Sequence, residues 1–462
     1  MKRRKTGKIC MGAAALWLFL LCGCGAEAPR LEDGALSREN AWDASEAEPE
    51  SREAGAGAEG SGAGENCWEE ERKAEGQDGQ TGAGDSAEDP GAEAEGTASE
   101  PAGVASSEDP KEDDAPQEVT LVMVGDILLH TRVAESGRTE DGGYDFTAVF
   151  AQMKEEIGQA DIALVNQEVI IGGEELGVSG YPAFNAPYEL GDALVDAGFD
   201  VILHATNHAL DKGRKGLLNC LAFWEENYPE ETVVGIHESS EKSQEICVVE
   251  QDGIRIAILN YTYGTNGIAL PEDMPYAVEL LEEQRVAEDI RAAEELADFT
   301  IVCPHWGTEY TLTQTKAQER WARFFSENGA DLVIGTHPHV PEPVEWVEDT
   351  LVYYSLGNFV NWTSGTVDGV ANRMVGGMAR VTLTREEDGE VVISDWSVEP
   401  LVCHVEKGFG GVTVYPLAEY TEELAGRNEI VSQDADFSLE YCLEVVDQVF
   451  GEAARGPQQG RP

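Results

Sequence analysis

Residues that could bind a metal or move a proton follow the predicted strands of this chain in a repeated pattern. Five short apolar runs each end in a carboxylate, an amide or an imidazole. The run Leu332–Ile334 stops at Gly335, and His337 and His339 follow with Pro338 between them. The other four runs lead to Asp126, to Glu168, to Asn207 with His208, and to His305. Because the carboxyl ends of parallel strands meet at one edge of an α/β sheet, we expect these side chains to lie close together.

The types of residue indicate which metals would suit this edge. Imidazole nitrogens together with carboxylate and amide oxygens, and without thiolates, favour Zn, Mn or Fe over a cysteine-rich structural zinc site. Each residue alone has an ordinary alternative: Asp126 as a turn former or helix cap, Glu168 as a solvated loop acid, Asn207 as a turn residue and His305 as a packed histidine. Recurrence at all five strand ends is hard to attribute to turns, so we predict a site for one or two divalent ions. We interpret the other four histidines as structural or surface residues: His130, His204, His237 and His404.

The elements between these residues alternate between strands and helices. Apolar residues of the intervening segments recur at i, i+3 and i+4, as in amphipathic helices. Beyond residue 350 strands predominate, including an antiparallel pair over 378–384 and 391–398. Two short helices are expected near 418–426 and 439–450. This succession predicts a layered α/β domain over residues 118–415 that contains a second, mixed sheet. A C-terminal helical appendage and tail is expected at 416–462.

The first 24 residues have the pattern of an export signal. Lys2–Lys5 and Lys8 form a positive region before an apolar run over residues 11–21, which is short for a membrane span. The run ends in Leu21-Cys22-Gly23-Cys24, which resembles the lipobox of bacterial lipoproteins and implies lipidation of Cys24. We therefore expect a lipid-anchored protein on the extracytoplasmic face of the bacterial cell membrane. An ordinary secretory signal or an uncleaved anchor is the alternative.

Residues 25–117 consist mostly of Ala, Gly, Glu, Ser, Asp and Pro, with almost nothing to bury. This composition predicts a disordered acidic tether between the anchor and the folded domain. The whole chain has 31 Lys and Arg against 89 Asp and Glu, a formal net charge of −58, which argues against a nucleic-acid partner. The cysteines beyond the lipobox show no paired spacing, so we expect buried free thiols and no disulfide framework.

Longer motifs around the candidate residues resemble those of a known family. Seven segments, in matching order over residues 119–405, are similar to the CapA family of poly-γ-glutamate (capsule) synthesis proteins: Val124–Asp126, Val165–Glu168, Ala205–Asp211, Tyr261–Gly267, His305–Tyr310, Gly335–His339 and Tyr354–Phe359. That family resembles a divergent branch of the calcineurin-like metallophosphoesterases. The resemblance implies a four-layer α/β/β/α sandwich.

The resemblance also implies a role for each candidate residue. It assigns two metal positions that share Glu168: Asp126, Glu168 and His339 in the first, and Glu168, Asn207, His305 and His337 in the second. His208 would be the catalytic acid beside the leaving group. Asp211 could orient His208, or could only cap the following helix.

Two departures from the phosphoesterase pattern leave catalysis open. No histidine stands two residues after Asp126, and Glu168 occupies a place where aspartate is usual, so the first metal position is poor in ligands. A weakly occupied or single-metal site is therefore an alternative to a pair of ions.

Three functions agree with these residues. The first is a metal-dependent hydrolase acting in the synthesis, export or attachment of an anionic polymer such as poly-γ-glutamate. The second is a phosphomonoesterase or phosphodiesterase acting on a cell-surface or nucleotide phosphate. The third is a non-catalytic scaffold or polymer-binding subunit. In each case, membrane-bound polymer-synthase subunits are candidate partners.

Overall fold

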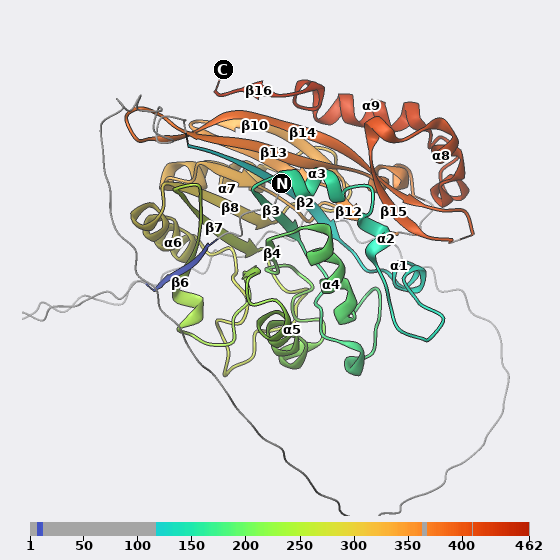
Figure 1. The fold of residues 1–462 in the computed structure, drawn as a ribbon, viewed down its shortest axis with the longest axis horizontal. Helices are drawn as coiled ribbons and strands as arrows, with labels where there is room; N and C mark the ends of the chain where they lie inside the picture. Colours follow the sequence, from blue (N-terminus) through green and yellow to red (C-terminus); the bar gives the residue numbers. More distant parts are fainter. Residues whose placement is uncertain (1–6, 13–116, 363–366, 409, 462) are drawn as a thin grey trace, which may run out of the picture. The chain divides into compact units, whose positions relative to one another are not determined.

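Two mixed β-sheets packed face to face form the centre of the fold (Figure 1). The computed structural model describes residues 7–12, 117–362, 367–408 and 410–461. Cys24 and nearly all of the predicted tether lie outside these described residues.

Sheet I has the strand order β15-β14-β13-β2-β3-β4-β5. Its parallel part consists of β2 (Glu118–Ile127), β3 (Ile162–Asn166), β4 (Val201–Leu203) and β5 (Thr232–Val234). Its antiparallel part consists of β13 (Val375–Arg385), β14 (Val391–Val405) and β15 (Val412–Pro416). The short strands β12 (Asn358–Val360) and β16 (Gln458–Gln459) pair with β2 and β14 respectively.

Sheet II has the strand order β1-β6-β7-β8-β9-β11-β10. Its parallel strands are β7 (Ile254–Thr262), β8 (Phe299–His305), β9 (Leu332–Ile334) and β11 (Thr350–Leu356). The antiparallel strands at its edges are β1 (Gly7–Gly12), β6 (Glu245–Gln251) and β10 (Pro341–Val347). The inner faces of the two sheets meet in a common apolar core, where the sulfur atoms of Met123 and Cys303 lie 3.9 Å apart.

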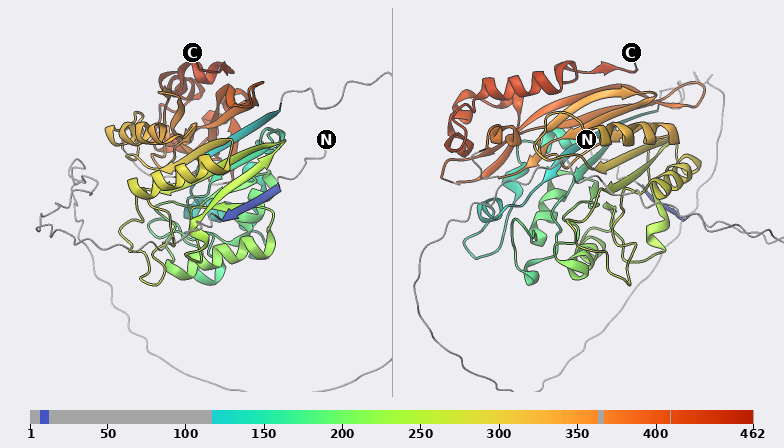
Figure 2. Two further views of the ribbon diagram at one scale, coloured as in Figure 1. Left: turned by 90° about the vertical axis from the view of Figure 1, so that its left-hand side faces the viewer. Right: turned by 180° about the vertical axis from the view of Figure 1, so that it is seen from behind.

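Helices cover the outer faces of both sheets. On sheet II, α6 (Glu283–Leu296) and α7 (Lys316–Asn328) bury Val286, Ile290 and Phe325 against the strands (Figure 2). The helices on the side of sheet I are α2 (Thr147–Phe150), α3 (Lys154–Gln159), α4 (Tyr188–Ala197) and α5 (Gly213–Asn227). The predicted four-layer α/β/β/α arrangement is thus confirmed. Among the described residues, none of the helices has the length and apolarity needed to cross a bilayer.

Local sequence signals fix the ends of these elements. Helix α7 begins at a capping box between Thr315 and Gln318, which satisfies two backbone N–H groups of the first turn. It ends at Gly329, whose φ of 109° is the left-handed conformation that glycine adopts at low cost. Thr315, Gln318 and Gly329 are all of the residue types that favour these caps.

The C-terminal segment packs on the same core. After α1 (Thr131–Ser136) near the start of the domain, the remaining helices are α8 (Glu422–Arg427) and α9 (Leu439–Val449), close to the two short helices expected there. Short 3₁₀ turns lie at Glu174–Leu176, Lys242–Gln244, Val370–Met374, Leu417–Glu419, Glu429–Ser432 and Gly451–Arg455. Cys442 and Phe450 join the core cluster that contains β13 and β14, and α8 and α9 lie beside these strands in Figure 1.

The five cysteines between residues 117 and 461 are free thiols, as expected from their spacing. Cys220, Cys303, Cys403 and Cys442 are buried, and Cys247 is half-buried. Burial raises the pKa of Cys220 and of Cys403 to about 12, so both are protonated at neutral pH.

One buried acid should make the stability of the fold depend on pH. Glu342 on β10 is fully buried, and burial raises the pKa of its carboxyl group to about 8, although Gln318 donates a hydrogen bond to it at 2.5 Å. In the unfolded chain the same group ionises near its ordinary value of 4.5. The folded state therefore binds the extra proton between these two values, and its stability falls as the pH rises from 4.5 to 8.

We expect Glu342→Gln to remove this loss of stability, because the amide stays neutral and still accepts from Gln318. The expected gain in the free energy of unfolding at pH 8 is on the order of 1–3 kcal/mol, with a smaller effect at pH 4.5. Chemical denaturation at both pH values measures it. An equal effect at both values would contradict the proposed ionisation.

Candidate metal centre

Five strands from the two sheets end at one place. Asp126 lies near the end of β2 in sheet I, and His305 is the last residue of β8 in sheet II. The backbone N–H of His337 donates to both oxygens of Asp126, at 3.3 and 3.2 Å, and so joins the loop after β9 to sheet I. A bridge between His305 and Thr336 aligns the two neighbouring strand ends of sheet II. The strand-end residues lie close together, as expected, but the expectation of one sheet edge is corrected: β2, β3 and β4 belong to sheet I, and β8 and β9 belong to sheet II.

Close approach, and not a left-handed turn, explains the glycine before the two histidines. A Cβ on Gly335 would lie 2.1 Å from the carbonyl oxygen of Tyr354 and 2.3 Å from Nε1 of Trp306. The left-handed residues are the histidines themselves, with φ of 99° at His337 and 59° at His339. Such backbone costs of order 1–3 kcal/mol at each non-glycine residue and is typical of functional sites.

The structure forms two groups of possible metal ligands that share one carboxylate. Asp126, Glu168 and His339 make the first group; Glu168, His305 and His337 make the second. Oε1 of Glu168 lies 3.6 Å from Nε2 of His305, and Oε2 lies 3.8 Å from Nδ1 of His339. Glu168 thus lies between the two groups, and its two oxygens could help to hold a divalent ion in each of them.

The polar atoms of the site also fit a bound cation. Both carboxylate oxygens of Glu168 are buried, and no hydrogen-bond partner for either is found among the described residues. The buried Nδ1 of His337 is in the same situation. Oδ1 of Asn207 lies 3.1 Å from Nε2 of His305, where both atoms could coordinate one ion. Since a buried carboxylate without compensation is costly, a cation between these atoms would stabilise the cluster.

Charge within the cluster is strongly coupled. Burial and then Glu168 raise the pKa of Asp126. Burial also acts to raise the pKa of Glu168, but His339 and His305 outweigh it and hold that pKa low. Burial and neighbouring imidazoles lower the pKa of His337, whereas Glu168 and Asp126 overcome burial and raise that of His339 to about 9. A proton on His339 thus balances the carboxylates when no cation does, and a metal ion would displace it.

His208 is held beside this cluster by an aspartate. Nδ1 of His208 lies 2.6 Å from Oδ2 of Asp211, and its Nε2 lies 4.0 Å from Oε1 of Glu168. Oδ2 of Asp211 also accepts a hydrogen bond from the backbone N–H of Phe184 at 2.7 Å. The following helix, α5, has Lys212 as its N-cap residue and no side-chain cap. Of the two alternatives for Asp211, contact with His208 is therefore the one observed.

Several residues that border the site were not predicted from the sequence. Glu309 forms a third possible ligand group with His337 and His339. The ring of Tyr263 lies 4.6 Å from that of His337, and Asn266 accepts from Asn207 at 3.3 Å. These three residues belong to motifs that carried the family resemblance, and this was the available signal.

His130 is also closer to the site than expected. Burial lowers its pKa to about 4, and the charge of His339 contributes. Its ring packs edge-on against Phe184 at 5.1 Å, and Phe184 packs in the same way on His208 at 4.7 Å. The other three histidines have structural contacts, as predicted: His204 accepts from Trp224, His237 pairs with Glu279, and His404 hydrogen-bonds Tyr420.

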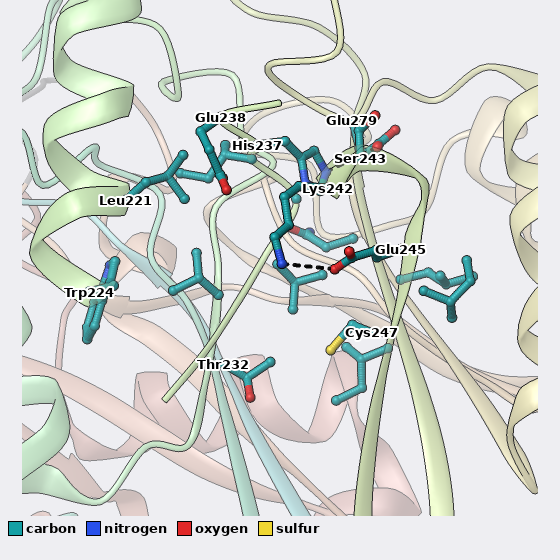
Figure 3. A pocket seen from close by; sticks show the side chains of 18 of the residues that line it. Leu221, Trp224, Thr232, His237, Glu238, Lys242, Ser243, Glu245, Cys247 and Glu279 are labelled. Carbon is teal, nitrogen blue, oxygen red and sulfur yellow. Dashed lines mark hydrogen bonds and ion pairs between the residues drawn. The ribbon is translucent and has the colours of Figure 1, made fainter. Parts of the chain in front are cut away.

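A separate cavity of about 610 Å³ lies between α5, β5 and the β6–β7 pair (Figure 3). Leu221 and Trp224 line its apolar part, and Lys242 pairs with Glu245 at 3.1 Å beside it. None of the predicted metal ligands lines it. We assign the chemistry to the strand-end cluster, because the unsatisfied buried donors and acceptors that suit a cation are there.

Fold and site together define a layered α/β domain with a candidate dinuclear metal centre. The family described as bacterial capsule synthesis protein PGA_cap matches residues 120–363, more than half of the chain. The chain belongs to this family, which confirms the resemblance to CapA proteins.

Two curated relatives are capsule proteins. The PGA biosynthesis protein CapA of Bacillus subtilis (strain 168) is 36% identical over 176 residues, covering 37% of this chain and 45% of the relative. The capsule biosynthesis protein CapA of Bacillus anthracis is 28% identical over 267 residues, covering 54% of this chain and 61% of the relative. The chain thus spans roughly half the length of these relatives.

Two solved structures with some similarity are a phosphoesterase and a nucleotidase. The calcineurin-like phosphoesterase YfkN from Bacillus subtilis is 13% identical, with a TM-score of 0.34, and the match covers 71% of this chain and 100% of that one. The NAD nucleotidase of Haemophilus influenzae is 14% identical, with a TM-score of 0.38, covering 72% and 63%.

Metal analysis tests the cluster directly. We expect about two divalent ions per purified chain after incubation with Mn²⁺ or Zn²⁺. Asp126→Ala removes one ligand from the first group, and His337→Ala removes one from the second. Each variant should lower the metal content by about one ion or more. Asp141→Ala, on an exposed loop, is the matched control and should change nothing. A wild-type chain that binds neither metal would contradict the assignment.

Proposed function

We propose that this protein is a metal-dependent hydrolase that acts in the synthesis, export or attachment of an anionic cell-surface polymer, with poly-γ-glutamate as the leading substrate. The observation that carries the proposal is Glu168 between two groups of ligands, with His208 held next to it by Asp211. Membership of the capsule synthesis family and the names of the two relatives support the polymer as substrate.

The residues of the chain divide the work between them. The two groups that share Glu168, with Asn207, would hold divalent ions, which when bound activate the attacked carbonyl or phosphoryl group and the attacking water. Asp211 accepts from Nδ1 of His208 and so orients the ring. Nε2 is then the ring atom that faces Glu168, and it can pass a proton to the departing nitrogen or oxygen. Phe184 packs on the imidazole and limits its rotation.

A second candidate function is binding of the polymer without catalysis. Asp126 already accepts hydrogen bonds from Asn166 at 2.8 Å and from the backbone of His337, and it contacts His339 at 3.1 Å. A carboxylate with these partners has less need of a metal than Glu168 does. A protein with a single ion could then serve as a scaffold beside membrane-bound polymer-synthase subunits.

Substitution of His208 separates the two functions. We expect His208→Ala to lower turnover of γ-glutamyl amides or phosphoesters by about 10²–10⁴-fold while metal content stays constant, because the residue moves a proton and holds no ion. His237→Ala is the matched control, since His237 pairs with Glu279 outside the cluster. Loss of metal in His208→Ala would make His208 a ligand. Capsule formation that survives the substitution would favour the scaffold.

The N-terminal sequence supports the proposal that Cys24 anchors the protein by lipid to the extracytoplasmic face of the membrane. Cys24→Ala should then move the protein from the membrane fraction to the soluble fraction and abolish labelling by a radioactive fatty acid. Cys22→Ala, two residues away, should retain both properties. The opposite result for the two variants would place the modified cysteine at position 22.

A further inference from the structure

Tyr310 is an exposed aromatic residue fixed to the loop that carries the two histidines. Its backbone N–H donates to the carbonyl oxygen of Pro338 at 2.8 Å, and its ring lies 6.0 Å from that of His339. The side chain is 46% exposed. Its φ of 67° is unusual for a bulky residue, and such strain is typical of positions with a functional constraint.

Arg373 places a cation on this ring. Its guanidinium carbon lies 3.4 Å from the centroid of Tyr310. The side chain of Asn358 donates both to the carbonyl oxygen of Arg373, at 3.0 Å, and to that of His339, at 2.9 Å. Arg373 is thus connected to the histidine loop in two independent ways, once through the tyrosine ring and once through Asn358.

The depth of Arg373 matches that of the candidate ligands. It is 8% exposed, against 6% for His339 and for His208. Besides burial, His339 and His208, the charge of Arg373 lowers the pKa of His130, which borders the cluster. Burial lowers the pKa of Arg373, but arginine remains a cation at neutral pH.

The chemistry of a stacked guanidinium selects its ligand. A guanidinium lying flat on an aromatic ring keeps its N–H groups in the plane, where they match two oxygens of one carboxylate or phosphate. In a chain with 89 acidic residues and 31 basic ones, an anionic substrate needs such a local cation to approach the site.

We propose that Arg373, stacked on Tyr310, is the anion-binding subsite of the substrate site. It binds an oxyanion that lies next to the bond held at the cluster. In poly-γ-glutamate this group would be the α-carboxylate beside the γ-amide; in a phosphoester it would be a phosphate oxygen pair. This inference rests on the proposed function, because it places the bond to be cleaved at the metal centre. Binding of the anion can nevertheless be measured without turnover.

Calorimetric titration of the metal-loaded chain tests the subsite with two probes, a γ-linked glutamate trimer and orthophosphate. Arg373→Gln should weaken binding of the favoured probe by about tenfold to hundredfold, the range for a hydrogen-bonded charge. Arg373→Lys keeps the charge but not the planar guanidinium, so its affinity for the probe should lie between those of the wild type and Arg373→Gln. Arg380→Gln is the matched control, because Arg380 pairs with Glu156 on α3. Metal content and unfolding temperature should stay the same in all three variants.

The outcomes separate the possible sources of the anion. A loss confined to the trimer identifies a carboxylate subsite, and a loss confined to orthophosphate identifies a phosphate subsite. Equal affinity of wild type and Arg373→Gln for both probes would overturn the proposal, as would loss of metal in that variant, which would mean a structural role.

Kinetics distinguish this result from failure of the proposed function. If the protein turns over a γ-glutamyl amide, Arg373→Gln should raise KM for the free α-carboxylate substrate and leave kcat nearly constant. Turnover of the corresponding α-methyl ester should not change. If the wild-type chain hydrolyses nothing, the proposed function fails while the binding measurement still decides on the subsite.

Discussion

The buried carboxylate of Glu168 is the constraint around which the site is built. Both of its oxygens are withdrawn from water, and histidines from sheet II and its loops stand at 3.6 and 3.8 Å from them. An isolated charge in such a place would destabilise the fold, so the surrounding imidazoles and the strand ends that carry them must stay in register. The link from the backbone of His337 to Asp126 holds the two sheets together at this point. The packing of the two sheets, the charge balance of the cluster and its chemistry therefore all depend on the strand ends around Glu168.

Many of the site residues could be predicted from the sequence, because a β-branched run that ends in a polar residue predicts both a strand and the position where it ends. Asp126, His305 and His337 were found in this way. Glu309 and Arg373 were not. Glu309 lies in a motif of the family resemblance, but as one acid among 89 it does not follow a strand end, and Arg373 in a 3₁₀ turn carries no local signal. Their relevance comes from contacts across distant parts of the chain. The backbone of His337 and His339 was also beyond prediction, because the left-handed conformation is imposed by tertiary contacts and not by residue type.

The negative charge of the whole chain makes the local positive charge at the site important for binding an anion. The chain repels anions as a whole, yet the family to which it belongs is named for synthesis of an anionic capsule. The structure offers two sources of positive charge: a cluster suited to divalent cations, and the guanidinium of Arg373, which Asn358 links to the loop of His339. Such an arrangement would admit an anion at one point of an otherwise acidic chain.

The left-handed backbone at His337, His339 and Tyr310 means that the histidine motif is not portable. In a free peptide, or grafted after an unrelated strand, the same five residues from Gly335 to His339 would relax to ordinary dihedral angles and their imidazoles would diverge. The geometry resides in the neighbours that force it, namely Asp126 from the other sheet and the close contact of Gly335 with Tyr354. A search by sequence motif alone would therefore retrieve chains that share the letters without sharing the site.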